Sequence, residues 1–142
     1  MNKYDYLEIN TDGGSRGNPG PAAIGAYAQS AGQTVFTLSE TIGETTNNVA
    51  EYTAVLRSLE TILEKEVASE KLKFILDSEL IVKQILGQYK VKQPHLQILR
   101  SKIVDLAKKL QEKQLIKLMT IVNVPREQNK IADKLVNKAL DK

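Results

Sequence analysis

Residues 6–21 have the sequence YLEINTDGGSRGNPGP, a run of alternating apolar and polar residues followed by a stretch rich in glycine and proline. The alternation places Leu7 and Ile9 on one face and predicts a strand that ends at Asp12. The glycines and prolines predict a long connection over residues 13–21 that leads into a second strand rather than a helix. Because so many glycines allow a ligand to approach the backbone closely, Asp12 at the mouth of this connection is a candidate functional residue.

The rest of the sequence predicts two further strands and then helices that alternate with strands. From Val49 to Leu63, apolar residues recur three and four positions apart and predict an amphipathic helix. A meander of three strands followed by alternating units predicts an α/β fold, a mixed sheet flanked by helices. The expected strands are residues 6–12, 22–29, 34–42, 72–76 and 116–124, and the expected helices are 49–63, 78–86, 96–110 and 128–140.

The composition is that of a soluble globular protein, with 42% apolar and 26% charged residues among 142. This length predicts one domain, residues 1–142, with a sizeable core. The sequence contains no secretory signal and no apolar stretch of bilayer length, so we expect a cytoplasmic protein with no membrane partner. The absence of cysteine excludes disulfides, thiolate zinc sites and a cysteine nucleophile. The single histidine, His95, is expected to face solvent at the start of a helix.

The net charge of +3 is unevenly distributed along the chain. Residues 1–70 carry −6 and residues 71–142 carry +9, counted from Lys, Arg, Asp and Glu. An acidic half with candidate metal ligands beside a basic half suits a polyanion whose phosphates bridge the two. Three lysines of the basic half are better explained by solvation of an outer helix face than by binding of a polyanion, namely Lys108, Lys109 and Lys113.

Four carboxylates stand at the ends of predicted elements, where they could meet. Asp12 ends the first strand, Asp77 ends a later strand, and Glu51 and Asp133 lie in the first turns of two helices. Carboxylates that converge repel one another, and a divalent cation resolves the repulsion. A ligand set made only of oxygen favours a hard cation such as Mg²⁺ or Mn²⁺. The pattern therefore indicates a metal site suited to phosphate chemistry.

Each carboxylate also has a purely structural explanation. The run from Asn48 to Glu51 resembles a capping box, with Glu51 three residues after the N-cap. Asp77 could itself cap the helix that follows it, and the helix dipole favours an acid such as Asp133 in a first turn. The joint placement of the four acids, together with the glycine-rich stretch, favours the metal site.

Five blocks of the sequence, in the same order and rough spacing, resemble ribonuclease H of type 1 over nearly the whole chain. The resemblance implies a ribonuclease H-like fold, a five-stranded mixed sheet with an antiparallel meander of three strands, two parallel strands and helices on both faces. It also implies hydrolysis of the RNA strand of an RNA–DNA hybrid that leaves 5′-phosphate and 3′-hydroxyl ends. The blocks are Thr11-Asp12-Gly13-Gly14, Gly17-Asn18-Pro19-Gly20, Thr46-Asn47-Asn48 through Glu51, Leu76-Asp77-Ser78 and Ala132-Asp133.

The same resemblance implies two metal ions, Mg²⁺ with Mn²⁺ as the alternative. Asp12 would bridge both ions, Asp133 would help to hold the ion that activates water, and Glu51 and Asp77 would hold the ion at the leaving oxygen. Recognition of RNA requires contacts to its 2′-hydroxyl groups. The residues implied in substrate contact are Gly13 and Gly14 through their backbone, Asn18, Asn47 and Ser78 at the RNA strand, and Thr46 and Asn48 at a phosphate of the DNA strand.

The sequence departs from the pattern of many family members at the segment 87–94. Many members insert a basic helix and loop there to bind the hybrid, whereas this segment is too short for one. The chain therefore resembles the compact form of the enzyme, with Lys90 and Lys92 as a small basic remnant. Glu79 stands where other members often have glutamine, which puts its contact with RNA in doubt.

A second departure lies in the loop before the last helix. Many members carry a histidine there that is thought to aid product release, whereas this chain has Arg126 and Glu127. We expect Arg126 to hold or release the scissile phosphate. The alternative is a surface ion pair between Arg126 and Glu127 that contributes little to stability.

Two other functions fit the sequence less well. One is a relative of the same fold with different chemistry, such as a 3′–5′ exonuclease or a recombinase, although exonucleases generally carry Asp-x-Glu where this chain has Asp12-Gly13-Gly14. The other is a non-catalytic module that only binds nucleic acid, although all four acids are present. Because the sequence has no exposed apolar heptad, we expect a monomer with no obligate protein partner.

Overall fold

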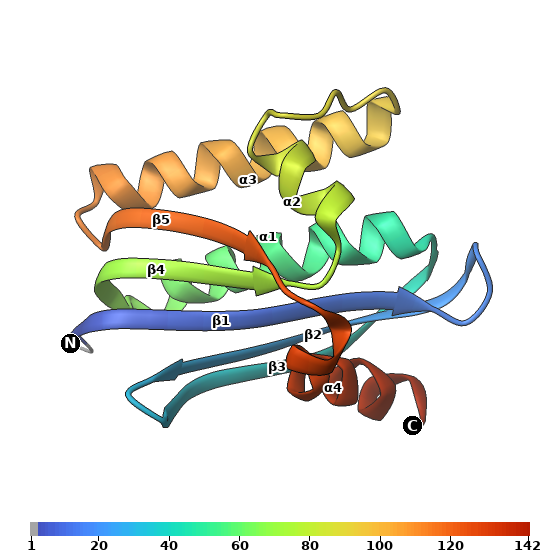
Figure 1. Cartoon of the computed structure of the whole chain (residues 1–142), viewed down its shortest axis with the longest axis horizontal. Coiled ribbons are helices and arrows are strands. Elements are labelled where there is room, and N and C mark those ends of the chain that lie inside the picture. The colour runs from blue at the N-terminus through green and yellow to red at the C-terminus, as the bar shows by residue number, and fades with distance from the viewer. Residues whose placement is uncertain (1–2) are drawn as a thin grey trace.

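The computed structural model describes residues 3–142 and contains a five-stranded sheet flanked by four helices (Figure 1). Across the sheet the strands lie in the order β3-β2-β1-β4-β5. The strands are β1 (Lys3–Ser15), β2 (Gly20–Ser30), β3 (Gln33–Thr45), β4 (Ala68–Leu76) and β5 (Ile116–Asn123). The helices are α1 (Asn47–Lys65), α2 (Glu79–Ile85), α3 (Pro94–Glu112) and α4 (Lys130–Leu140), and the short 3₁₀ helix η1 (Arg126–Gln128) precedes α4. Within residues 3–142, no helix is long and apolar enough to cross a membrane.

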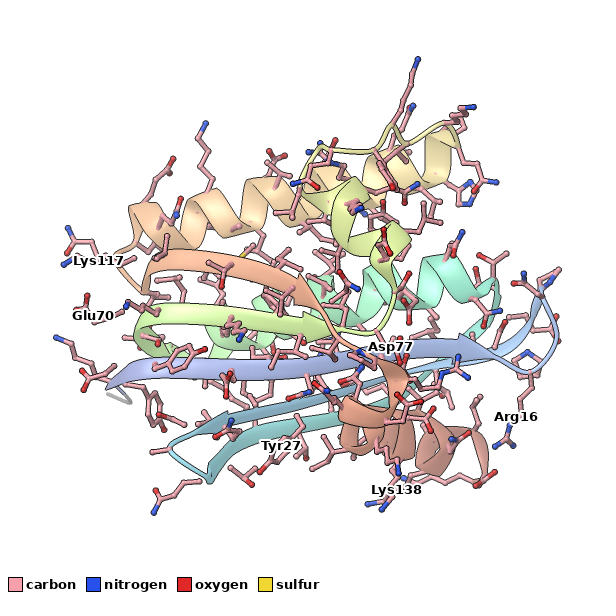
Figure 2. The ribbon with its side chains drawn as sticks, in the orientation of Figure 1. Arg16, Tyr27, Glu70, Asp77, Lys117 and Lys138 are labelled. Carbon is pink, nitrogen blue, oxygen red and sulfur yellow. The ribbon has the colours of Figure 1, made fainter. Side chains whose placement is uncertain are left out.

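The pairing of the strands confirms the expected mixed sheet. Strands β1, β2 and β3 form an antiparallel meander, and β4 and β5 run parallel to β1. An ion pair of 3.5 Å between Glu70 and Lys117 joins the beginnings of β4 and β5, and Asp77 follows the opposite end of β4 (Figure 2). The carboxyl ends of β1, β4 and β5 therefore point toward the same edge of the sheet.

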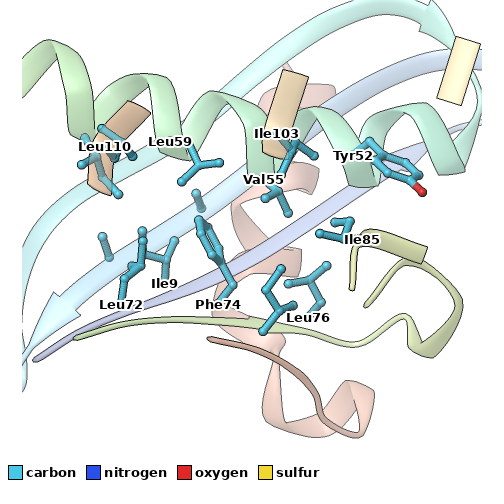
Figure 3. Packing of buried hydrophobic residues seen from close by; sticks show 14 of the residues in the cluster. Ile9, Tyr52, Val55, Leu59, Leu72, Phe74, Leu76, Ile85, Ile103 and Leu110 are labelled. Carbon is cyan, nitrogen blue, oxygen red and sulfur yellow. The ribbon is translucent and has the colours of Figure 1, made fainter. Parts of the chain in front are cut away.

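The main core lies between the sheet and the helices α1 to α3. Ile9, Leu72 and Phe74 from the sheet belong to one buried cluster with Leu59 of α1 and Ile103 of α3 (Figure 3). These five side chains are at most 1% exposed. Burial of apolar surface contributes about 25 cal/mol per Å², so this cluster holds α1 firmly over β1 and β4.

Helices α1 and α4 cover opposite faces of the sheet, and a glycine lets each helix approach closely. A Cβ atom at Gly13 of β1 would lie 2.2 Å from the backbone carbonyl carbon of Ala50 in α1. A Cβ atom at Gly25 of β2 would lie 2.4 Å from the backbone oxygen of Ala132 in α4. Gly25 pairs with Asp12, and consecutive residues of a strand point to opposite faces. Gly13 therefore faces α1, and Asp12 faces the side of the sheet that α4 covers.

Several strand boundaries differ from the expected ones by up to four residues, and two of these differences lie in β1 and β4, which carry or precede site residues. Strand β1 does not end at Asp12 but continues to Ser15, and residues 13–15 pair with residues 22–24 of β2. The first glycines of the expected connection are thus part of the ladder, and Gly17, with a φ of 99°, supplies the left-handed conformation in the turn. Strand β4 begins at Ala68, four residues before the expected start.

The helix starts remove two of the structural explanations for the acids. Thr46 is the N-cap of α1, and its side chain accepts a hydrogen bond from the first turn, so the alternative explanation of Glu51 as part of a capping box is wrong. Ser78, rather than Asp77, caps α2 in the same way. Asp133 does lie in the first turn of α4, as expected.

Replacing Gly13 with Ala is expected to lower the free energy of unfolding by about 3 kcal/mol or more, because the added methyl group would meet the rigid backbone of α1. Gly14→Ala is the matched control, since its Cβ would meet the Val136 side chain at 3.7 Å, an ordinary contact. Gly14→Ala should lower the free energy of unfolding by less than about 1 kcal/mol. Urea unfolding of both variants measures the difference, and equal losses would show that α1 can shift over β1 at little cost.

Candidate active site

Four elements bring the predicted acids to one edge of the sheet. Asp12 lies near the end of β1, and Asp77 directly follows the parallel neighbour β4. Glu51 lies in the beginning of α1, and Asp133 lies in the first turn of α4. Because α1 and α4 cover opposite faces, the two helices deliver their acids to this edge from opposite sides of the sheet.

Three of the acids come within contact distance of a common point. Asp12, Glu51 and Asp77 each offer one carboxylate oxygen, and these oxygens lie within 4.8 Å of one another. The backbone N–H of Gly13 donates to Oδ1 of Asp12 at 3.0 Å and to Oε1 of Glu51 at 3.3 Å. The close approach of α1 at Gly13 is therefore what lets Glu51 reach Asp12. Asp133 is outside this trio in the part of the chain that the structure describes, but it lines the same groove.

Burial and mutual repulsion raise the proton affinity of the acids. Burial is the largest cause that raises the pKa of Asp12 to about 6; the hydrogen bond with Glu51 lowers it, and the charges of Asp77 and Asp133 raise it further. Burial also raises the pKa of Glu51 well above its usual value, and the neighbouring Asp12 adds to the increase. Oε2 of Glu51 is buried without a hydrogen-bond partner. The cluster is thus poorly compensated when all of its members are ionised.

Asp77 has partners that offset part of this cost. Burial raises the pKa of Asp77, whereas the positive charge of Arg126 and the side-chain amide of Asn129 lower it. Arg126 lies in η1, directly before α4, so the loop that carries it brings a cation to the acid cluster. Within residues 3–142, no ion pair joins Arg126 to Glu127, which leaves the guanidinium available to the groove.

Asn129 is a residue of the site that the sequence did not reveal. It is fully buried, and its Nδ2 donates to the backbone carbonyl of Thr11 at 2.9 Å. Its Oδ1 accepts from Nδ2 of Asn10 at 3.0 Å. Because its backbone N–H also donates to the carbonyl oxygen of Arg126 and it directly precedes α4, Asn129 ties the loop and helix of Asp133 to the strand of Asp12. The sequence predicts a helix over 128–140 and places Asn129 inside its first turn, so its sequence position gave no sign of this role.

The acids line a groove of about 510 Å³ that contains most of the predicted site residues. The groove is open along α4, which contributes Val136, Asn137 and Leu140, none of them singled out from the sequence. Ser15 at the end of β1 and Arg16 in the β1–β2 turn also line the groove, and neither was predicted. The predicted residues found there are Asp12, Gly13, Gly14, Asn47, Asn48, Glu51, Asp77, Ser78, Arg126 and Asp133.

Two predicted substrate residues, Asn18 and Thr46, support the groove rather than line it. Oδ1 of Asn18 accepts a hydrogen bond from the backbone N–H of Asn47 at 2.9 Å. Asn47 in turn accepts one from the backbone N–H of Ser15 at 2.9 Å through its side chain. Thr46 caps α1 directly beside them. The turn after β1 is thus bonded to the start of α1, which fixes one wall of the groove.

The donor set of the groove fits a divalent cation. It offers carboxylate oxygens at short mutual distances, one of them buried and unpartnered, in a cluster that repulsion destabilises. Among the ion pairs of residues 3–142, none includes any of the four acids. Hard cations prefer such oxygen ligands, and their charge would relieve the repulsion.

Comparison with known proteins points to one family. A family model described as reverse transcriptase-like matches residues 10–139. The ribonuclease HI of Halobacterium salinarum is 37% identical over 131 residues, which cover 92% of this chain and 62% of that protein. A bifunctional protein of Mycobacterium tuberculosis is 38% identical over 135 residues, which cover 94% of this chain. The chain spans only about a third (35%) of that mycobacterial relative.

Solved structures agree with these sequence matches. RNase H1 from Halobacterium salinarum superposes with a TM-score of 0.85 at 35% identity, over 96% of this chain and 98% of that one. LC11-RNase H1, isolated from compost and solved in complex with an RNA/DNA hybrid, gives a TM-score of 0.85 at 43% identity, over 95% of this chain and 96% of that one. The fold, the acids at the sheet edge and these matches agree, and the chain belongs to the type 1 ribonuclease H family.

Proposed function

We propose that the protein is an endoribonuclease that hydrolyses the RNA strand of RNA–DNA hybrids and leaves 5′-phosphate and 3′-hydroxyl ends. The observation that carries the proposal is the trio of carboxylate oxygens within 4.8 Å, set in a groove at the sheet edge. The likeness to an enzyme solved with an RNA/DNA hybrid supports the choice of substrate. No observation favours a non-catalytic role, since all four acids are present and three of them converge.

Asp12, Glu51, Asp77 and Asp133 would hold two Mg²⁺ ions, or Mn²⁺ in their place. Asp12 is central, because the charges of Asp77 and Asp133 both act on it and Glu51 shares its hydrogen-bond donor. When bound, the ions would lower the pKa of the attacking water and offset charge on the leaving oxygen. The protein itself buries Oε2 of Glu51, donates to Asp12 through the N–H of Gly13, and places the charge of Arg126 near Asp77.

The walls of the groove supply the contacts that distinguish RNA. Gly13 and Gly14 present backbone without side chains, so a ribose can approach closely, and Ser78 lies beside Asp77. A 2′-hydroxyl both donates and accepts hydrogen bonds, and Asn47 and Ser78 can match it. Asn18 would act near the RNA strand by holding Asn47 in place. Thr46 and Asn48 at the start of α1 would contact a phosphate of the DNA strand.

The direct test is cleavage of a labelled hybrid by the purified protein, compared with duplex DNA and single-stranded RNA and DNA. Products are expected from the RNA strand of the hybrid alone, with Mg²⁺ or Mn²⁺ present and not with EDTA. End-group analysis would identify the 5′-phosphate. Stepwise release of nucleotides from a 3′ end would favour an exonuclease of the same fold, and binding without cleavage would favour a non-catalytic module.

Asp12→Asn is expected to abolish hybrid cleavage while the hybrid still binds, because it removes a ligand charge and almost no volume. Without metal it should also raise thermal stability. The pKa of Asp12 is about 6 in the folded protein against 3.8 for an unperturbed Asp, so its protonation supports folding below about pH 4 and this support is lost as the pH rises through about 6.

The gain in metal-free Asp12→Asn should therefore be on the order of 1–3 kcal/mol at pH 8 and should shrink toward pH 4. Thermal unfolding in EDTA at the two pH values measures it. Asp105→Asn, which neutralises an exposed acid on α3, is the control and should show no such trend. Substantial cleavage by Asp12→Asn at saturating Mg²⁺ would contradict the assignment of Asp12.

The short segment between α2 and α3 leads to a second prediction. Lys90 and Lys92 are exposed there, and Lys90 lines a small groove with Arg100. Replacing both with Ala should reduce the slope of log affinity against log salt by about one to two, because each phosphate contact contributes nearly one. The matched control is Lys108→Ala with Lys109→Ala on α3, which should leave the slope unchanged. An unchanged slope in the variant that lacks Lys90 and Lys92 would show that the hybrid does not contact this segment.

Arg126 leads to a third prediction, since it is exposed beside Asp77 and cannot transfer a proton near neutral pH. Arg126→Ala should slow turnover by a similar factor at every pH from 6 to 9, and Arg126→Lys should retain much of the rate. Rate profiles of the two variants, with His95→Ala as a control that changes nothing, provide the measurement. Wild-type turnover by Arg126→Ala would assign the loop a structural role only.

A further inference from the structure

Arg16 occupies an unusual position at the far end of the groove. It follows Asp12 by four residues along an extended strand, which rises about 3.3 Å per residue, so the two backbones are about 13 Å apart. Its guanidinium donates to the carboxylate of Asp141 and, at 3.5 Å, to the backbone carbonyl of Leu140. Figure 2 shows Arg16 at the β1–β2 turn, near the end of α4. The contact thus joins the two walls of the groove, β1 and α4.

Arg16 also has a distinct charge environment. Within the described chain, the residues that line the groove include four acids and two cations, Arg126 and Arg16. Arg126 acts on Asp77 at the cluster itself. Arg16 is the remaining cation, and it lies at the far end of the groove, between the β1–β2 turn and the end of α4. A polyanion in the groove would therefore meet one positive charge at the acids and another at the β1–β2 turn.

The contact between Arg16 and Asp141 is weak enough to exchange. The two side chains are 49% and 64% exposed, and ion pairs with such exposure contribute little to folding stability. The planar guanidinium binds the oxygens of a phosphate in the same forked geometry that it uses for a carboxylate. A phosphodiester that enters the groove can thus replace Asp141 at Arg16 with little loss of folding stability.

We propose that Arg16 binds a backbone phosphate of the nucleic-acid strand in the groove, a few nucleotides from the reacting phosphate, and that Asp141 competes with this phosphate for the guanidinium. The proposal rests on the proposed function for the identity of the strand. Arg16 is then a substrate-binding residue, and Asp141 sets its affinity by occupying it when the groove is empty. The carboxylate also keeps the guanidinium at the groove wall, where the phosphate arrives.

The test is equilibrium binding of a fluorescently labelled RNA–DNA hybrid in EDTA, measured by anisotropy over a range of salt concentrations. Arg16→Ala should weaken binding severalfold at low salt and reduce the slope of log affinity against log salt by about one. Arg16→Lys should keep the slope, because it keeps the charge. Asp141→Asn should tighten binding by about twofold to fivefold at low salt, the range that an exposed ion pair allows.

A double mutant separates competition from general electrostatics. In the Arg16→Ala background, Asp141→Asn should no longer tighten binding, because the competition has been removed. Asp105→Asn on α3 removes the same charge away from the groove and should not reproduce the effect of Asp141→Asn. In steady-state cleavage, Arg16→Ala should raise KM and leave kcat nearly unchanged. Arg16→Gln serves as a second neutral variant, and thermal unfolding verifies that each variant is folded.

Failure of this inference differs from failure of the proposed function. Wild-type affinity and salt slope in both Arg16→Ala and Arg16→Gln would overturn the role of Arg16. Equal tightening by Asp141→Asn with and without Arg16 would overturn the competition. If the wild-type protein cleaves no hybrid but binds it with a salt slope that depends on Arg16, the phosphate site stands and the proposed activity fails.

Discussion

The main physical constraint on this structure is the repulsion among carboxylates that the fold brings together at one edge of its sheet. Burial raises the pKa of Asp12, Glu51 and Asp77, and the charges of Asp77 and Asp133 add to the increase at Asp12. A protein selected for stability alone would place apolar or neutral side chains here. The electrostatic cost of this cluster is understandable if a divalent cation is the expected occupant. The binding energy of such a cation would offset the repulsion that is already present in the folded chain.

The surrounding structure supports the acids without neutralising them. The Gly13 N–H serves two carboxylates, and this is possible only because the missing Cβ lets α1 approach β1 to within contact of its backbone. Asn129 joins the carbonyl of Thr11 to the start of α4 and lowers the pKa of Asp77. Neutral donors of this kind orient carboxylate oxygens while leaving their charge for a metal ion. A lysine in the same place would satisfy the acids and compete with the ion.

The sequence predicted the order of the elements and the four acids because these depend on local periodicity and on residues at element ends. It did not predict that β1 continues to Ser15, because glycines and prolines indicate a turn, whereas Gly13 and Gly14 pair in the ladder and Gly13 lets α1 approach closely. It also misplaced the N-cap of α1. Asn47 and Asn48 are as suitable as Thr46 by propensity, but Asn47 is engaged with Ser15 and Asn18, contacts that only the folded chain provides. Asn129 was missed for the same reason, because its partners are Asn10 and Thr11, more than a hundred residues earlier.

The two arginines of the groove differ in their distance from the acid cluster and therefore in what their charges act on. Arg126 is close enough to lower the pKa of Asp77, so its charge is part of the balance that keeps this acid able to ionise. Arg16 is bound to Asp141 at the end of α4 and is exposed, so its charge is available to a ligand. If a nucleic-acid strand occupies the groove as proposed, both cations would counter the repulsion between its phosphates and the acids. The segment 87–94 is too short for a basic insertion, so under the proposed function the energy of binding nucleic acid would come from such single contacts along the groove. On this proposal, Arg16 at the β1–β2 turn would contribute to binding although it is remote from the acid cluster.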